Sequence, residues 1–326
     1  MKTHKLVLVG VGHVGSYVLA DAMKTGLFGK ISLIDIDKGV ARGEMLDQFH
    51  ATALTYMNNV EVVDGGYEEC ADADIIVIAA GASALKDPAN PNAKVDRTIL
   101  TPINAAVIRQ VMTGITEYTR EAVVILITNP LDTMVYIAAS EFDYPAGKVF
   151  GTGTMLDSAR LRKLIADDYK VDPKSVTAYM MGEHGFTAFP VLSKANIAGV
   201  PYADLPTLFP DKPNHSADEL KEAVVASAYD VLNSKGWTNA GVAQAAITMA
   251  KAVLLDEKSV LPACTILQGE YGFDGDVALS MPCVIGINGV ERRLPVALND
   301  YEQLKLKESA AYIMSAMEAA NTGGRN

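Results

Sequence analysis

Three glycines with the spacing G-x-G-x-x-G stand between an apolar run at residues 6–9 and a helical pattern at residues 14–25. Gly10 permits a tight turn, Gly12 lets the backbone approach a ligand, and Gly15 lets a helix pack closely on a strand. The first turn of that helix would offer N–H groups without helical partners to an anionic ligand. The spacing also fits a glycine turn that binds nothing, so a second feature must decide.

Asp35 is that second feature. It ends the next apolar run and lies twenty positions after Gly15, where an acidic side chain accepts hydrogen bonds from the ribose of an adenine dinucleotide. The carboxylate would repel a 2′-phosphate, so the expected cofactor is NAD rather than NADP. Asp37 competes for this role but also suits the N-cap of the following helix. Gly81, at the end of a later apolar run, is expected to leave room beside the cofactor.

Short β-branched runs alternate with helical patterns through the first half of the chain, as in a parallel sheet with crossover helices. After about residue 145 the pattern changes to a long helix, glycine-rich turns and later strands. The sequence thus predicts an α/β fold: a Rossmann-type doubly wound parallel sheet in residues 1–145 and a mixed α+β domain in residues 146–326. The expected strands are residues 6–9, 31–35, 60–63, 75–79 and 123–128, and the expected helices are residues 14–25, 40–53, 98–118 and 155–169.

Composition narrows the classes of function. The 326 residues are 49% hydrophobic and 21% charged, as in an ordinary soluble protein. No uncharged apolar run reaches the roughly 18 residues of a membrane span, and no signal peptide is evident, so we expect a cytoplasmic protein without a membrane partner. The net charge of −11 disfavours nucleic acid as a partner. Three scattered cysteines and five histidines lack the spacing of metal ligands, so no metal site is expected.

Three side chains in the second half have the chemistry of a proton-transfer site. Asp157 and Arg160 lie three positions apart on a predicted helix and share a face, and His184 stands in the run Gly-Glu-His-Gly. Taken singly, they would be a surface ion pair and a turn histidine. Together they supply a proton donor that works near neutral pH, a carboxylate to hold it, and a guanidinium for bidentate binding of a carboxylate. A hydride transfer between a nicotinamide and a hydroxy acid needs these three parts.

These motifs, in this order, resemble the L-lactate/malate dehydrogenase family. The resemblance covers nearly the whole chain and includes Gly10 to Gly15, Asp35, Thr128-Asn129-Pro130, Gly153 to Arg160, Gly182 to Gly185 and Gly236-Trp237-Thr238. Within the family, the chain most resembles bacterial L-2-hydroxyisocaproate and L-lactate dehydrogenases, and residues 232–238 and 250–253 are similar to segments of the former. The resemblance implies that residues 1–145 bind NAD and that residues 146–326 form the catalytic domain.

The resemblance also implies a role for each matching residue. His184 corresponds to the acid and base, Asp157 to its partner, and Arg160 to the clamp for the substrate carboxylate. Asn129 corresponds to a hydrogen-bond donor near the reacting oxygen, beside the cofactor. Arg97 corresponds to the arginine of a mobile loop that closes over the substrate and polarises its carbonyl group.

The substrate-binding segment departs from the usual pattern, although Thr238 matches the family's pocket threonine. Fifteen residues separate Gly81 from Arg97, more than in common lactate dehydrogenases. This segment carries neither the glutamine typical of lactate enzymes nor the second arginine typical of malate enzymes, and Ala84 takes that place. We therefore expect 2-oxo acids with branched or bulky side chains. Strict lactate specificity is the first alternative, and malate is the second, because Lys86 offers a point charge.

Partners and regulation follow from the same comparison. We expect a homo-oligomer, a tetramer rather than a dimer. Allosteric bacterial lactate dehydrogenases resemble the chain at Arg162 but have histidine in place of Thr177, so activation by fructose 1,6-bisphosphate is not expected. The alternative from another class is a non-catalytic NAD-binding sensor. It is disfavoured because every expected catalytic position holds a chemically competent residue.

Overall fold

The computed structural model describes residues 4–82 and 100–322. Their strands form one sheet of nine in the order β14-β13-β12-β6-β5-β4-β1-β2-β3, with two small sheets outside it. The strands of the large sheet are β1 (His4–Val9), β2 (Phe28–Ile34), β3 (Glu61–Asp64), β4 (Ile75–Ile78), β5 (Val123–Leu126), β6 (Val149–Gly151), β12 (Ser259–Gln268), β13 (Asp274–Gly286) and β14 (Gly289–Arg293). The helices that concern the site are α1 (Gly15–Thr25), α2 (Lys38–Ala51), α3 (Thr101–Thr116), α4 (Leu131–Ser140), α5 (Met155–Tyr169), α7 (Ala217–Lys235), α8 (Ala240–Leu254) and α9 (Asp300–Thr322).

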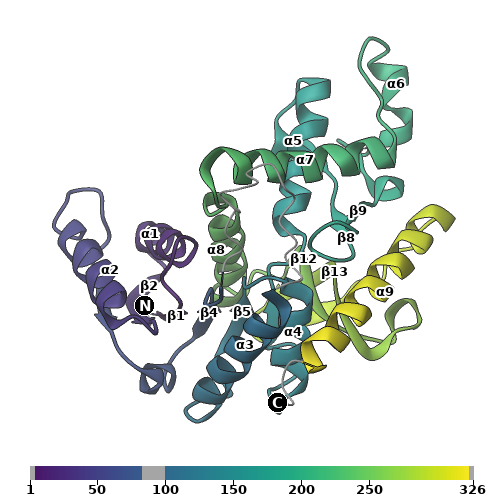
Figure 1. The fold of residues 1–326 in the computed structure, drawn as a ribbon. Coiled ribbons are helices and arrows are strands. Elements are labelled where there is room, and N and C mark those ends of the chain that lie inside the picture. The colour runs from purple at the N-terminus through teal and green to yellow at the C-terminus, as the bar shows by residue number, and fades with distance from the viewer. Residues whose placement is uncertain (1–3, 83–99, 323–326) are drawn as a thin grey trace.

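The strands β1 to β6 are all parallel, which confirms the predicted Rossmann-type sheet. Every residue of β4 and β5 is buried, as an unbroken apolar run between two layers of helices requires. Alternate residues of β1 belong to different core clusters, because successive side chains point to opposite faces. One cluster packs α1 and α8 on the sheet, and the other packs α3 and α4 on the opposite face (Figure 1).

The sheet does not end where the predicted first domain ends. β6 lies beyond residue 145 and still pairs in parallel with β5. The antiparallel strands β12, β13 and β14 then extend the same sheet, with Cys264 of β12 opposite Gly151 of β6. A three-residue strand is too short to show periodicity in the sequence. The division into residues 1–145 and 146–326 stays a proposal.

A third core cluster forms an outer lobe from α5, α7 and short strands such as β7 (Val176–Thr177) and β10 (Asn196–Ile197). In Figure 1 this lobe stands above the sheet, with α8 leading back to it. Among the described residues, no helix has the length and apolarity needed to cross a membrane.

Candidate active site

The glycine loop joins β1 to α1, and its three glycines serve different needs. Gly10 has a φ of +89°, and a side chain there would meet the backbone of Ala80. A Cβ on Gly15 would overlap the carbonyl oxygen of Gly10, so only glycine lets α1 pack this closely on the strand. By contrast, no described atom lies within 4 Å of a Cβ placed on Gly12. That open space, at the start of a helix, suits the approach of a phosphate.

Asp35 follows β2 directly and faces the glycine loop. Its Oδ2 accepts a hydrogen bond from the backbone N–H of Val11 at 2.8 Å, and its Oδ1 accepts one from that of Asp37 at 2.9 Å. The competing residue, Asp37, caps α2 by accepting from the N–H groups of Gly39 and Val40. Asp35 is therefore the carboxylate that reaches the loop, while Asp37 is a structural cap.

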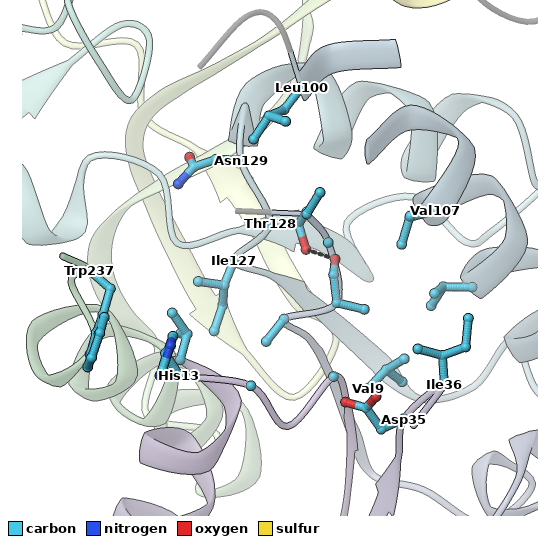
Figure 2. A pocket seen from close by; sticks show the side chains of 18 of the residues that line it. Val9, His13, Asp35, Ile36, Leu100, Val107, Ile127, Thr128, Asn129 and Trp237 are labelled. Atoms are coloured by element: carbon cyan, nitrogen blue, oxygen red, sulfur yellow. Dashed lines mark hydrogen bonds between the residues drawn. The ribbon is translucent and has the colours of Figure 1, made fainter. Parts of the chain in front are cut away.

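A groove with a volume of about 730 Å³ runs from Asp35 past the glycine loop to Thr238. Figure 2 shows Asp35 at one end, with His13 and Trp237 at the other. Open space at Gly12, helix N–H groups and a carboxylate at the ribose end fit an extended dinucleotide without a 2′-phosphate. The residues present thus suit NAD.

Gly81 lines this groove, but a side chain added there would contact other residues of the protein. An added Cβ would lie 2.6 Å from Cγ2 of Thr128 and 3.1 Å from Oδ1 of Asn104. Thr128 in turn donates to the carbonyl of Ala80 at 2.7 Å, the bond drawn in Figure 2. Packing within the protein therefore requires a small residue at position 81, and contact with the cofactor stays a prediction.

Asp157 lies between the side chains of His184 and Arg160. Its Oδ2 is 2.6 Å from Nδ1 of His184, and its Oδ1 accepts from Nη1 of Arg160 at 2.9 Å. Burial alone would raise the pKa of Asp157, but the charges and hydrogen bonds of His184 and Arg160 outweigh burial and lower it. The carboxylate thus stays ionised, orients the imidazole and stabilises its protonated form.

The backbone that carries His184 is fixed from two sides. Gly182, with a φ of +90°, exchanges two backbone hydrogen bonds with Ser280 of β13. The N–H of His184 donates to Oδ2 of Asp132 at 2.8 Å. Burial raises the pKa of Asp132 to about 7, with a further contribution from the charge of Glu183. The sequence gives no sign of this contact, because an acidic residue such as Asp132 is ordinary in the first turn of a helix.

A smaller cavity of about 120 Å³ adjoins the groove and is lined by His184, Asp157 and Arg160. Asn129 and Thr238 line both spaces. The described structure thus brings together His184, Asp157 and Arg160 beside Asn129 and Thr238. Arg97 and the segment with Ala84 and Lys86 lie outside the described residues. No group of three or more His, Cys, Asp or Glu side chains suited to a metal occurs in the described part of the chain.

Two family models together match the chain from residue 4 to residue 322. The lactate/malate dehydrogenase NAD binding domain matches residues 4–151, and the alpha/beta C-terminal domain of the same family matches residues 154–322. The chain belongs to the lactate/malate dehydrogenase family. It is an NAD-dependent dehydrogenase of this family.

This dehydrogenase is similar over nearly its whole length to proteins with related names. It is 44% identical over 319 residues to L-lactate dehydrogenase 2 of Clostridium acetobutylicum, with 98% of each chain covered. It is 41% identical over 316 residues to an L-lactate dehydrogenase of Selenomonas ruminantium, covering 97% of this chain and 98% of that one. A crystal structure of the minor L-lactate dehydrogenase from Enterococcus mundtii in a ligand-bound form matches with a TM-score of 0.89 and 29% identity, covering 98% of this chain and 99% of that one.

Proposed function

We propose that the protein is an NAD-dependent L-2-hydroxyacid dehydrogenase that mainly reduces 2-oxo acids. One observation carries the proposal: Asp157 bonds both His184 and Arg160 in a cavity that meets the cofactor groove at Asn129 and Thr238. A proton donor and a carboxylate clamp therefore lie next to the place where a nicotinamide would end. The bound cofactor supplies or accepts the hydride.

The side chains divide the remaining work. Protonated His184 gives its proton to the oxo group, while Asp157 stabilises the charged imidazole. Arg160 grips the substrate carboxylate, and no described protein group accepts from its other guanidinium nitrogens. We assign to Arg97, outside the described residues, the polarisation of the oxo group. Reduction needs the protonated imidazole, so its rate should fall as pH rises, whereas oxidation should speed up.

Two observations bear on the side chain of the substrate. The relatives at 44% and 41% identity are named L-lactate dehydrogenases, which supports pyruvate and lactate. The cavity also has an apolar wall, where the rings of Phe186 and Tyr229 stack with centroids 6.0 Å apart beside Leu156, Val242 and Ile313. A hydrocarbon side chain suits that wall. We propose that pyruvate and larger, branched 2-oxo acids such as 2-oxoisocaproate are both substrates.

A dicarboxylate fits this cavity poorly. Arg160 is the only arginine or lysine among the described residues that line the cavity, and it is committed to one carboxylate. A second carboxylate would lose water without gaining a cationic partner from the described lining, and Lys86 lies outside the described residues. Malate is thus the weakest of the three candidate substrates.

The test is a panel assay of NADH oxidation with pyruvate, 2-oxoisocaproate, phenylpyruvate and oxaloacetate. We expect turnover of pyruvate and 2-oxoisocaproate, and the lowest kcat/KM for oxaloacetate. Turnover of pyruvate alone would remove the part of the proposal that concerns bulky side chains. A His184→Gln variant should lose turnover yet bind NADH normally. If the unaltered protein binds NADH but reduces none of the acids, it is a non-catalytic NAD-binding protein.

We also propose that the enzyme is a homo-oligomer, and a tetramer rather than a dimer. Large apolar side chains are exposed along α2 and just after it, which suits burial against a second copy. They are Val40, Leu46, Phe49, Leu54 and Tyr56. Sedimentation analysis of the full chain measures the state directly. Activation by fructose 1,6-bisphosphate is not expected, because position 177 holds a threonine rather than the histidine of allosteric relatives.

A further inference from the structure

Two rings stack face to face at the end of the cofactor groove. The centroids of His13 and Trp237 are 3.9 Å apart, and their planes are parallel. Both residues line the groove, and Figure 2 shows them side by side. Trp237 is 39% exposed, so the pair is not part of the core. Neither ring lines the smaller cavity that holds His184 and Asp157.

The two rings belong to segments that the fold holds independently. His13 is the fourth residue of the glycine loop, which Asp35 fixes through the N–H of Val11. Trp237 lies in the short connection between α7 and α8. Gly236, with a φ of +90°, ends α7, and the side chain of Asn239 caps α8.

That connection also borders the substrate cavity. Thr238 follows Trp237 directly and lines both the groove and the cavity. Further along the same interface, Nζ of Lys235 lies 5.9 Å from the ring centre of Tyr17 on α1. The stack therefore joins the loop that binds the cofactor to the segment that contacts the substrate.

We propose that His13 and Trp237 form a clasp that positions Thr238 for the substrate when the cofactor groove is filled. A cofactor bound along the glycine loop limits the movement of the His13 ring. Because that ring stacks on Trp237, the movement of Trp237 and of the next residue, Thr238, is limited as well. Linkage makes the effect mutual, so an ordered Trp237 also favours binding of the cofactor. The two rings are positioning residues, and the inference rests on the proposed function for its substrate half.

Alanine and phenylalanine variants of the two residues distinguish a role in positioning Thr238 from a role in local packing alone. His13→Ala and Trp237→Ala remove one ring each, while His13→Phe and Trp237→Phe keep a ring in place. Tyr118→Ala is the matched control, because Tyr118 is 46% exposed and lines neither space. The readouts are the Kd for NADH, followed by the fluorescence of NADH itself, the KM for pyruvate, and the Tm.

The alanine variants should raise both the Kd for NADH and the KM for pyruvate by about two- to tenfold, the range for one lost aromatic pair. The double alanine variant should be no worse than either single one, because each removes the same contact. The phenylalanine variants and Tyr118→Ala should stay near the unaltered protein. Trp237 is the only tryptophan of the chain, so its emission should change when NADH is added, and less so in His13→Ala.

Other results would overturn the clasp. Unchanged Kd and KM values with a lowered Tm would reduce the stack to local packing. A raised Kd for NADH with an unchanged KM for pyruvate would remove the link to the substrate cavity. If the unaltered protein reduces no 2-oxo acid, the proposed function fails. In that case an unchanged Kd for NADH in His13→Ala would overturn the cofactor half of the clasp as well.

Discussion

At the scale of single residues, the site depends on one buried carboxylate shared by two cations. Asp157 is 9% exposed in its side chain, and it bonds His184 with one oxygen and Arg160 with the other. A carboxylate so placed would be destabilising without partners, and both partners have a part in the proposed reaction. The arrangement explains why an aspartate and an arginine three positions apart on α5 are more than a surface ion pair.

Arg160→Lys tests the clamp. Lysine keeps the charge but loses the planar, bidentate geometry, so the KM for 2-oxo acids should rise by about 10- to 100-fold. The Kd for NADH should not change, because Arg160 lines only the substrate cavity. Arg162→Lys, the same substitution two positions further along α5, is the control in steady-state assays. Equal kinetics for the two variants would show that Arg160 does not hold the substrate.

At the scale of elements, the strand–loop–helix unit of β1 and α1 needs glycine for two separate reasons. Gly15 is required by packing, because a Cβ there would overlap the backbone of Gly10. Gly12 faces open space, so packing within the protein does not require it to be small. The structure thus accounts for the glycine at position 15, and the close approach of a ligand at Gly12 stays a prediction.

Two alanine variants should distinguish a glycine that packing requires from a glycine that the approach of the cofactor requires. Gly15→Ala should lower the Tm and weaken NADH binding together, since the loop must shift. Gly12→Ala should keep the Tm within about 2 °C, because the methyl group meets no protein atom, yet weaken NADH binding. Differential scanning calorimetry and a fluorescence titration measure the two effects. Normal NADH binding by Gly12→Ala would mean that the cofactor does not approach this turn.

At the scale of the whole molecule, elements from distant parts of the chain hold the segment around His184. Asp132 of α4 holds the N–H of His184, and Gly182 is bonded to β13 of the extended sheet. Asp132 is almost fully buried, and its pKa is raised to about 7. A carboxyl with a raised pKa binds its proton more tightly when folded, so folding stability falls as pH rises toward about 7.

The Tm as a function of pH tests this. Between about pH 5 and pH 7, Asp132→Asn should remove part of the decline seen in the unaltered protein, so the two curves diverge as pH rises. Asp157 adds no slope in that window, because its lowered pKa makes its contribution complete above about pH 4. Asp167→Asn, an exposed change on α5, is the control. Parallel curves for Asp132→Asn and the unaltered protein would contradict the raised pKa.

Much of the candidate site could be predicted because its residues stand at short, regular spacings within single structural units. The glycine spacing and Asp35 lie within one strand–helix–strand unit, and Asp157 and Arg160 lie within one helical turn. Asp132 could not be found this way, since its burial beside His184 arises from contacts between residues 52 positions apart. The stack of His13 on Trp237 and the pairing of β12 with β6 likewise join segments that no sequence periodicity connects.

By itself, the sequence determined the Rossmann-type sheet and NAD as the cofactor, and it predicted which residues act as the proton donor, its partner and the clamp. These depend on residue type and short spacing, which a chain carries before it folds. Only the tertiary structure decided that Asp35 rather than Asp37 reaches the glycine loop. It also showed that Thr128 leaves no room for a side chain at position 81. The meeting of groove and cavity at Asn129 and Thr238 likewise became visible only in the folded protein. Those outcomes depend on which surfaces the packed sheet and helices bring into contact.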